Sequence, residues 1–75
     1  MFNIRAESDL AIHPGELLAE ELEARGLTQR QLALNIDRTV QAINEIVRGK
    51  KAITAETALQ LEEALGVPAH LWVNL

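Results

Sequence analysis

Apolar residues recur along this chain at spacings of three and four, the pattern of helices that bury one face. The first such stripe is Leu17, Leu18 and Leu22, which follows an N-terminal stretch with no sustained period. No segment between Gly26 and Leu75 resembles a strand. The pattern therefore predicts an all-α fold whose other inward positions are Leu32, Ala33, Ile36, Ile43, Ile46, Val47, Ala58, Leu61 and Leu65.

Capping residues and helix breakers divide this pattern into five helices. Pro14 suits the first turn of a helix, where its missing N–H group would have no partner anyway. Thr28 followed by Gln31 matches a capping box, and Gly26 is a good helix stop. The predicted helices span about Pro14 to Arg25, Gln29 to Ile36, Val40 to Val47, Ala55 to Leu65, and Pro68 to near Asn74.

Length and composition indicate one small domain. Seventy-five residues, of which 48% are hydrophobic, are near the lower limit for a self-sufficient core. The chain has no cysteine, so disulfides cannot staple it, and oligomerisation is a natural way to bury more apolar surface. No apolar run reaches the roughly 20 residues of a membrane span, and we expect a cytoplasmic protein. Residues 1–12 are predicted to form an N-terminal arm before a domain of residues 13–75.

The charge is segregated along the chain. The net charge of −4 argues at first against DNA binding. Between Thr28 and Lys51, however, five basic residues oppose two acids, for a local charge of +3, whereas the remainder carries −7. DNA responds to the local field of the face presented to it, so this distribution favours DNA binding and leaves an acidic surface for a basic protein.

The segment from Thr28 to Lys51 has the pattern of a helix-turn-helix, in which the second helix enters the DNA major groove. Gln41 and Asn44 are three residues apart and share one exposed face of that helix, and such amides can bond adenine as a pair. Thr39 and Val40 lie at the end where base contacts concentrate. These four residues are the predicted base readers, although Gln41 and Asn44 are also compatible with a merely solvated helix face.

Contacts to the DNA phosphates are expected from neighbouring positions. The start of the second helix, at Thr28 and Gln29, offers free N–H groups and the positive end of a helix dipole. Basic side chains around the third helix would supply the remaining phosphate contacts, from Arg38, Arg48, Lys50 and Lys51.

The other candidate sites carry weaker signals. Glu16, Glu20 and Glu23 share one face of the first helix, which reads as a solvated face or as a surface for a basic partner. Trp72, with Leu71 and Leu75, suits either core packing or a dimer contact. The two histidines, His13 and His70, have no metal-like spacing and no nucleophile beside them, so we expect no metal, no cofactor and no enzymatic activity.

Three stretches of the chain resemble the HigA-type antidote family, also called VapI-like, within the lambda-repressor-like (XRE) group. They are HPGELLAEELEARGLTQRQLA, INEIVRGKKAITAETALQLEEALG and PAHLWVNL, and together they cover nearly everything after residue 12. The HPGE start, the GKKAIT link and the LWVNL ending, in this order, are more specific than the helix-turn-helix alone. The resemblance implies a five-helix DNA-binding domain that dimerises, represses its own operon and neutralises a basic toxin of the HigB type, usually an mRNA endonuclease.

The resemblance also implies roles for individual residues. The family's recognition positions fall on Thr39, Val40, Gln41 and Asn44, and its phosphate contacts on Gln29, Lys50 and Lys51. The turn departs from the family pattern, because Asp37 stands where glycine is usual and Arg38 where a hydrophobic residue is usual. Many relatives also continue beyond the LWVNL ending with another helical segment.

We therefore expect an antitoxin that binds an inverted-repeat operator as a symmetric dimer. One alternative is a stand-alone helix-turn-helix repressor without a toxin, for which the neighbouring reading frame is the discriminating observation. The other is a protein-interaction module that has lost DNA binding, which Asp37, Arg38 and the net acidity would explain.

Overall fold

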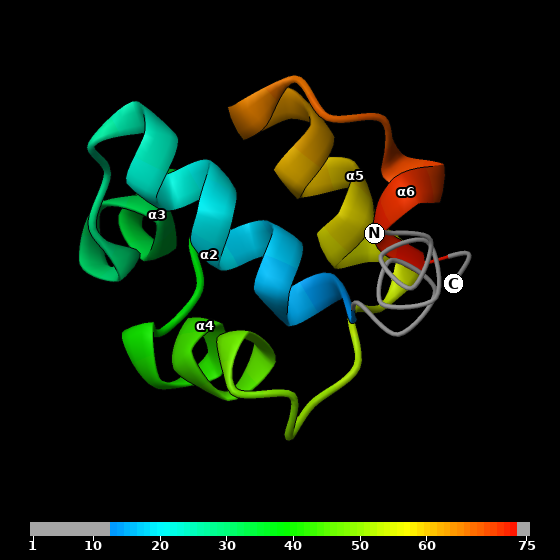
Figure 1. Ribbon diagram of the computed structural model, residues 1–75, viewed down its shortest axis with the longest axis horizontal. Coiled ribbons are helices and arrows are strands. Elements are labelled where there is room, and N and C mark those ends of the chain that lie inside the picture. Colours follow the sequence, from blue (N-terminus) through cyan, green and yellow to red (C-terminus); the bar gives the residue numbers. More distant parts are fainter. Residues whose placement is uncertain (1–12, 74–75) are drawn as a thin grey trace, which may run out of the picture.

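The computed structural model describes residues 13–73, which form five helices and no strand. The predicted arm of residues 1–12 lies outside the described residues. Helix α2 crosses the middle of the molecule, α4 lies below it, and α5 and α6 lie on the other side from α3 (Figure 1). Direct helix contacts join α2 to α4 and α6, α3 to α4, and α5 to α6. The all-α, five-helix prediction is confirmed, with α2 at Pro14–Arg25, α3 at Gln29–Asn35, α4 at Val40–Val47, α5 at Ala55–Leu65 and α6 at Ala69–Val73.

Side-chain caps set the starts of four helices. Thr28 and Gln31 form the reciprocal capping box at α3, with bonds of 3.0 and 2.9 Å. Thr39 and Thr54 accept hydrogen bonds from the backbone of Ala42 and Thr57, at 3.0 and 3.2 Å. Such caps satisfy N–H groups that have no partner inside the helix. The predicted boundaries are therefore right to within about one residue.

The core lies where the apolar faces of the helices meet. Leu18, Leu32, Ile43 and Leu61 are fully buried there, together with Trp72. The indole of Trp72 donates to the carbonyl of Val67 at 3.2 Å, which satisfies its polar atom inside the core. Of the two interpretations of Trp72, core packing is the one that the structure adopts, because a side chain with no exposed area cannot meet a second subunit.

The HPG sequence at the start of α2 has a structural purpose that sequence analysis missed. His13 is the N-cap, and its Nδ1 accepts a hydrogen bond from the backbone of Gly15 at 3.0 Å. At Gly15, α2 passes so close to α4 that a Cβ would overlap the carbonyl oxygen of Ile46 and lie 2.7 Å from that of Val47. This close approach fixes the start of α2 against the C-terminal end of α4.

The C-terminal ends of α2 and α5 are tied together by one arginine. The guanidinium of Arg25 donates to the carbonyl of Leu65, the last residue of α5, and also contacts Glu21 at 3.1 Å. A cation is favourable at a helix C-terminus, where carbonyl groups lack partners. Arg25 therefore links the C-terminal end of α2 to that of α5.

Candidate nucleic-acid interface

Helices α3 and α4 are joined by a tight turn whose geometry comes from a Schellman motif. The backbone of Arg38 donates to Ala33 at 2.8 Å, and that of Asp37 donates to Leu34 at 3.4 Å. These two bonds require a left-handed residue after the helix, and Asp37 has a φ of 58°. Asp37 thus adopts the left-handed conformation, which aspartate tolerates better than most residues with a side chain.

A change at Asp37 should report the strain in this turn. Among the described residues, Asp37 is the only non-glycine residue with positive φ, a conformation that costs most side chains roughly 1–2 kcal/mol. We expect Asp37→Gly to raise the free energy of unfolding by about 0.5–1 kcal/mol and Asp37→Ala to lower it. Urea unfolding of both variants and the parent chain measures their free energies of unfolding, with Asp37→Asn as the control for the lost charge. Equal stability of the Gly and Ala variants would contradict this account.

Helix α4 presents an apolar face to the core and a polar face to solvent. Ile43 and Ile46 are buried, whereas Gln41 is exposed and Val40 keeps 48% of its surface exposed. Thr39 uses its hydroxyl oxygen as the helix cap and remains exposed. The structure therefore places Thr39, Val40 and Gln41 together on the outer surface at the start of α4.

Asn44 is half-buried and is held by a residue of the preceding helix. Its amide donates to the side-chain oxygen of Gln29 at 3.2 Å. An asparagine amide has two N–H groups and one oxygen, so this bond leaves a donor and an acceptor free. Gln29, at the first position of α3, thus orients Asn44 beside Gln41. Gln29 and Asn44 are 15 residues apart, so the sequence alone did not predict their contact.

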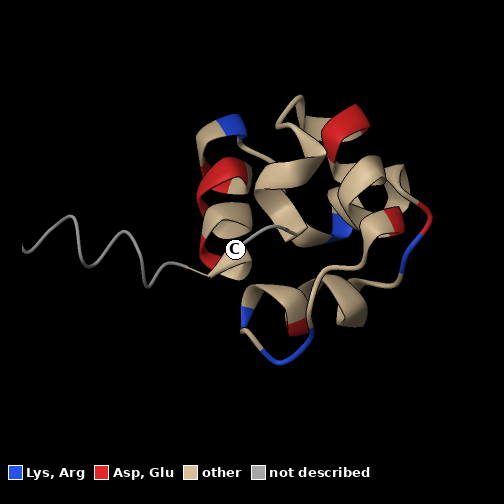
Figure 2. Ribbon diagram, turned by 90° about the vertical axis from the view of Figure 1, so that its right-hand side faces the viewer, with Lys and Arg blue, Asp and Glu red and all other residues tan. Residues whose placement is uncertain are grey.

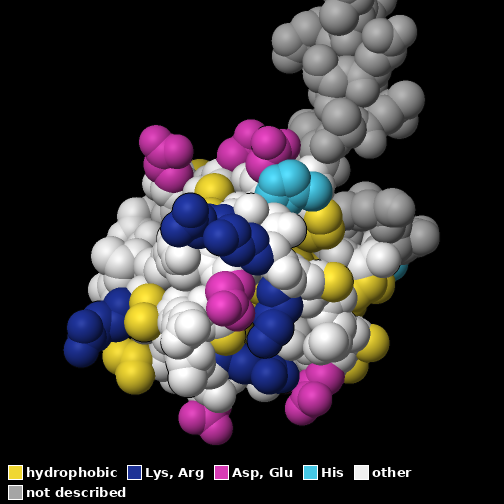
Figure 3. Space-filling model, turned by 90° about the horizontal axis from the view of Figure 1, so that it is seen from below, with side chains coloured by type: hydrophobic (Ala, Val, Ile, Leu, Met, Phe, Trp, Pro, Cys, Tyr) yellow, Lys and Arg dark blue, Asp and Glu magenta, His cyan; other side chains and the backbone are white. Residues whose placement is uncertain are grey.

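Basic side chains surround this face. Arg48, Lys50 and Lys51 lie exposed in the segment after α4, and Lys51 is 3.8 Å from Glu45. Figure 3 shows Lys and Arg side chains gathered over this side of the molecule, with most acidic side chains toward its rim. The basic segment follows α4 at the bottom of Figure 2, whereas most acidic positions lie on the helices above it. The polar face of α4 is therefore flanked by positive charge.

Arg38 is placed differently from the other predicted phosphate contacts. Its Nε donates to the side-chain oxygen of Gln60 in α5 at 3.0 Å, and its Nη2 lies 3.9 Å from a carboxylate oxygen of Glu56. Only 33% of its side chain is exposed. Both polar partners of Arg38 therefore belong to α5, although its side chain also borders a hollow that Lys51 lines.

The remaining predicted site residues are distributed over other faces. Glu16, Glu20 and Glu23 are all exposed on α2, and Leu71 is 41% exposed on α6. Leu75 lies outside the described residues. Among residues 13–73, no helix combines the length and the apolar character needed to span a bilayer.

A short capped helix, a left-handed turn and a second helix with an exposed polar face define a DNA-binding domain of the helix-turn-helix class. The helix-turn-helix family HTH_3 matches residues 18–72, and the chain belongs to that family. Its resemblance to the XRE-type, HigA-like proteins is confirmed by the comparisons below.

Relatives and solved structures extend this assignment. The chain is 47% identical over 66 residues to Virulence-associated protein I of Dichelobacter nodosus, covering 87% of this chain and 61% of that protein. It resembles an addiction module antidote protein of the HigA family from Coxiella burnetii, with a TM-score of 0.76 and 39% identity, covering 84% of this chain and 70% of the other. It also resembles Pseudomonas aeruginosa antitoxin HigA, in a structure with the higBA promoter. The TM-score is 0.77 and the identity 33%, covering 84% of this chain and 70% of the other. The fold is thus that of DNA-binding antitoxins and regulators.

Proposed function

We propose that this chain is the antitoxin of a type II toxin–antitoxin pair and represses its own operon. The observation that carries the DNA-binding part is the exposed start of α4, where Thr39, Val40 and Gln41 adjoin an Asn44 held by Gln29. Arg48, Lys50 and Lys51 beside them supply phosphate contacts, as does the start of α3 at Thr28.

The proposed complex is a symmetric dimer on an inverted repeat. A helix-turn-helix dimer places its two recognition helices about 34 Å apart, one turn of DNA, so each α4 would read one half-site. Leu71 on α6 is exposed and remains our proposed dimer contact, together with Leu75. Moving the half-sites apart by about five base pairs should abolish cooperative binding in a mobility-shift assay, because the second helix would then face the opposite side of the DNA.

The proposed toxin partner is a basic protein that binds the acidic face of α2. Exposed Glu16, Glu20 and Glu23 supply the complementary charge. We expect the product of the neighbouring reading frame to co-purify with this chain and to lose its toxicity on co-expression. Replacing the three glutamates with glutamine should weaken capture, most strongly at low salt, since charge complementarity acts mainly on association.

The matched control for the toxin experiment is the same exchange on another helix. Glu56, Glu62 and Glu63 of α5 are also exposed, and their replacement changes the net charge by the same amount. Equal weakening by both triple variants would assign the effect to net charge and overturn the α2 surface. No capture by the parent chain would instead favour a stand-alone repressor.

A further inference from the structure

The turn between α3 and α4 departs from the usual Schellman motif at its last position. The residue that donates the longer-range backbone bond commonly packs an apolar side chain against the preceding helix. Here that residue is Arg38, whose backbone donates to Ala33. Its side chain instead reaches α5, so the turn is held by a polar contact with a different element.

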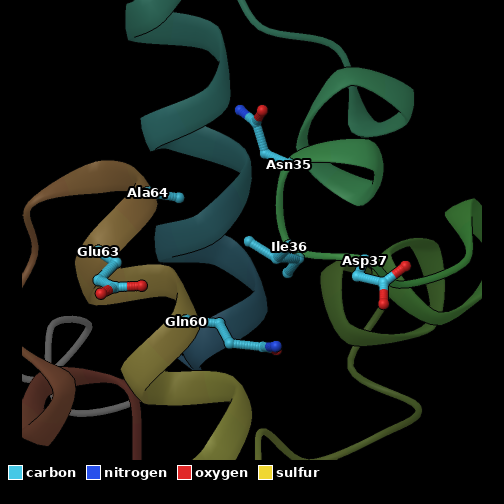
Figure 4. Close-up of a pocket in the computed structure, with 6 residues that line it drawn as sticks. All are labelled: Asn35, Ile36, Asp37, Gln60, Glu63 and Ala64. Carbon is cyan, nitrogen blue, oxygen red and sulfur yellow. The ribbon is translucent and has the colours of Figure 1, made fainter.

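The contact between Arg38 and Gln60 lies between two hollows on the surface of the domain. Gln60, which accepts its hydrogen bond, lines a groove of about 370 Å³ between the turn and α5, together with Asp37, Ile36 and Glu63. Figure 4 shows Gln60 extending from α5 toward the turn across this groove. On its other side, Arg38 lines a hollow of about 120 Å³ with residues of α4, the start of α5 and the segment between them, including Lys51. Arg38 thus bridges a region that side-chain packing leaves open.

We propose that Arg38 is a positioning residue that sets the angle of the recognition helix through Gln60, and does not contact DNA phosphate. Arg38 directly precedes Thr39, the N-cap of α4, so the bridge acts at the end of α4 that carries the base-reading side chains. A hydrogen bond from a charged donor is stronger than a neutral one, and Arg38 is two-thirds shielded from solvent. This inference rests on the proposed DNA-binding function.

The phosphate-contact alternative makes different demands on the same two residues. A phosphate contact needs the charge of Arg38 alone and lowers affinity for every duplex when it is lost. A positioning role needs Gln60 as much as Arg38. Loss of either residue would then lower the affinity for the operator more than the affinity for other duplexes. The dependence of affinity on salt separates the two, because each phosphate contact contributes about 0.9 to the slope of log affinity against log salt.

The test uses Arg38→Ala, Gln60→Ala and the double variant, with Glu63→Ala as the control from the same groove. Affinity is measured for the operator duplex and for a scrambled duplex across a salt series. We expect each single variant to lower the operator-to-scrambled affinity ratio by about fivefold or more, the double variant to lower it no further, and the salt slope to stay unchanged. The Glu63→Ala ratio should match that of the parent chain.

Two results would overturn the positioning role. The first is a loss of affinity for both duplexes in Arg38→Ala, with a salt slope reduced by about one, while Gln60→Ala binds normally. The second is a parent chain that discriminates and a Gln60→Ala variant that discriminates equally well. A parent chain that prefers neither duplex would overturn the proposed function itself. Hydrogen exchange of the Arg38 Nε–H group in the free protein, expected to be faster in Gln60→Ala, checks the bond without DNA.

Discussion

Replacing Gly15 with alanine should destabilise the domain by about 3 kcal/mol or more, although alanine is the better helix former. Gly15 lies buried in the first turn of α2, and an added Cβ would overlap the backbone of α4 at Ile46. Backbone atoms cannot rotate away as a flexible side chain can, so the two helices would have to separate. For a domain of this size, the melting temperature should fall by roughly 12–24 °C.

A second glycine provides the control for this prediction. Gly26 ends α2 with a φ of 68°, and a Cβ there would meet nothing within 4 Å. Gly26→Ala should therefore lose only about 1–2 kcal/mol, from backbone strain alone. Calorimetry of both variants measures the difference. A Gly15→Ala variant as stable as the parent chain would show that α2 and α4 do not make this close approach.

The double variant Gln41→Ala/Asn44→Ala should lose operator recognition while keeping its general attraction to DNA. Each bidentate contact to a base contributes about 1–3 kcal/mol of discrimination, so two contacts account for about 2–6 kcal/mol. Arg48, Lys50 and Lys51 are unchanged in this variant, and they act on any sequence. Titration of operator and scrambled duplexes by fluorescence anisotropy measures both quantities.

The control for the double variant is Asn35→Ala. Asn35 is also an exposed amide of the helix-turn-helix, but it lines the groove beside α5 and not the outer face of α4. Its loss should leave operator affinity unchanged. If the double variant and the Asn35→Ala variant discriminate as well as the parent chain, the amides of α4 do not read bases.

The helices themselves were predictable because their ends depend on neighbouring residues. The capping box of Thr28 and Gln31 spans four residues, and the turn at Asp37 is closed by backbone bonds between residues three and five positions apart. Such signals are contained in a short window of sequence, which is why the boundaries of α2, α4 and α5 match the prediction.

Contacts between distant residues could not be read from the sequence. The bond between Arg38 and Gln60 joins positions 22 apart, and nothing in the local pattern distinguishes Gln60 from any polar residue on a helix surface. The close approach of Gly15 to Ile46 is likewise a property of two packed helices. Charge alone groups Arg38 with the other cations, whereas its contacts with Gln60 and Glu56 support the positioning role that we propose.

The most direct test of DNA recognition is the affinity of the parent chain for the duplex upstream of its own operon, compared with a scrambled duplex of the same composition across a salt series. Specific binding by helix-turn-helix proteins typically exceeds non-specific binding by about 10³-fold or more at physiological salt. We expect such a preference, with affinity for both duplexes falling as salt rises. Equal affinity for the two duplexes would contradict the account, because the exposed face of α4 would then not be reading sequence.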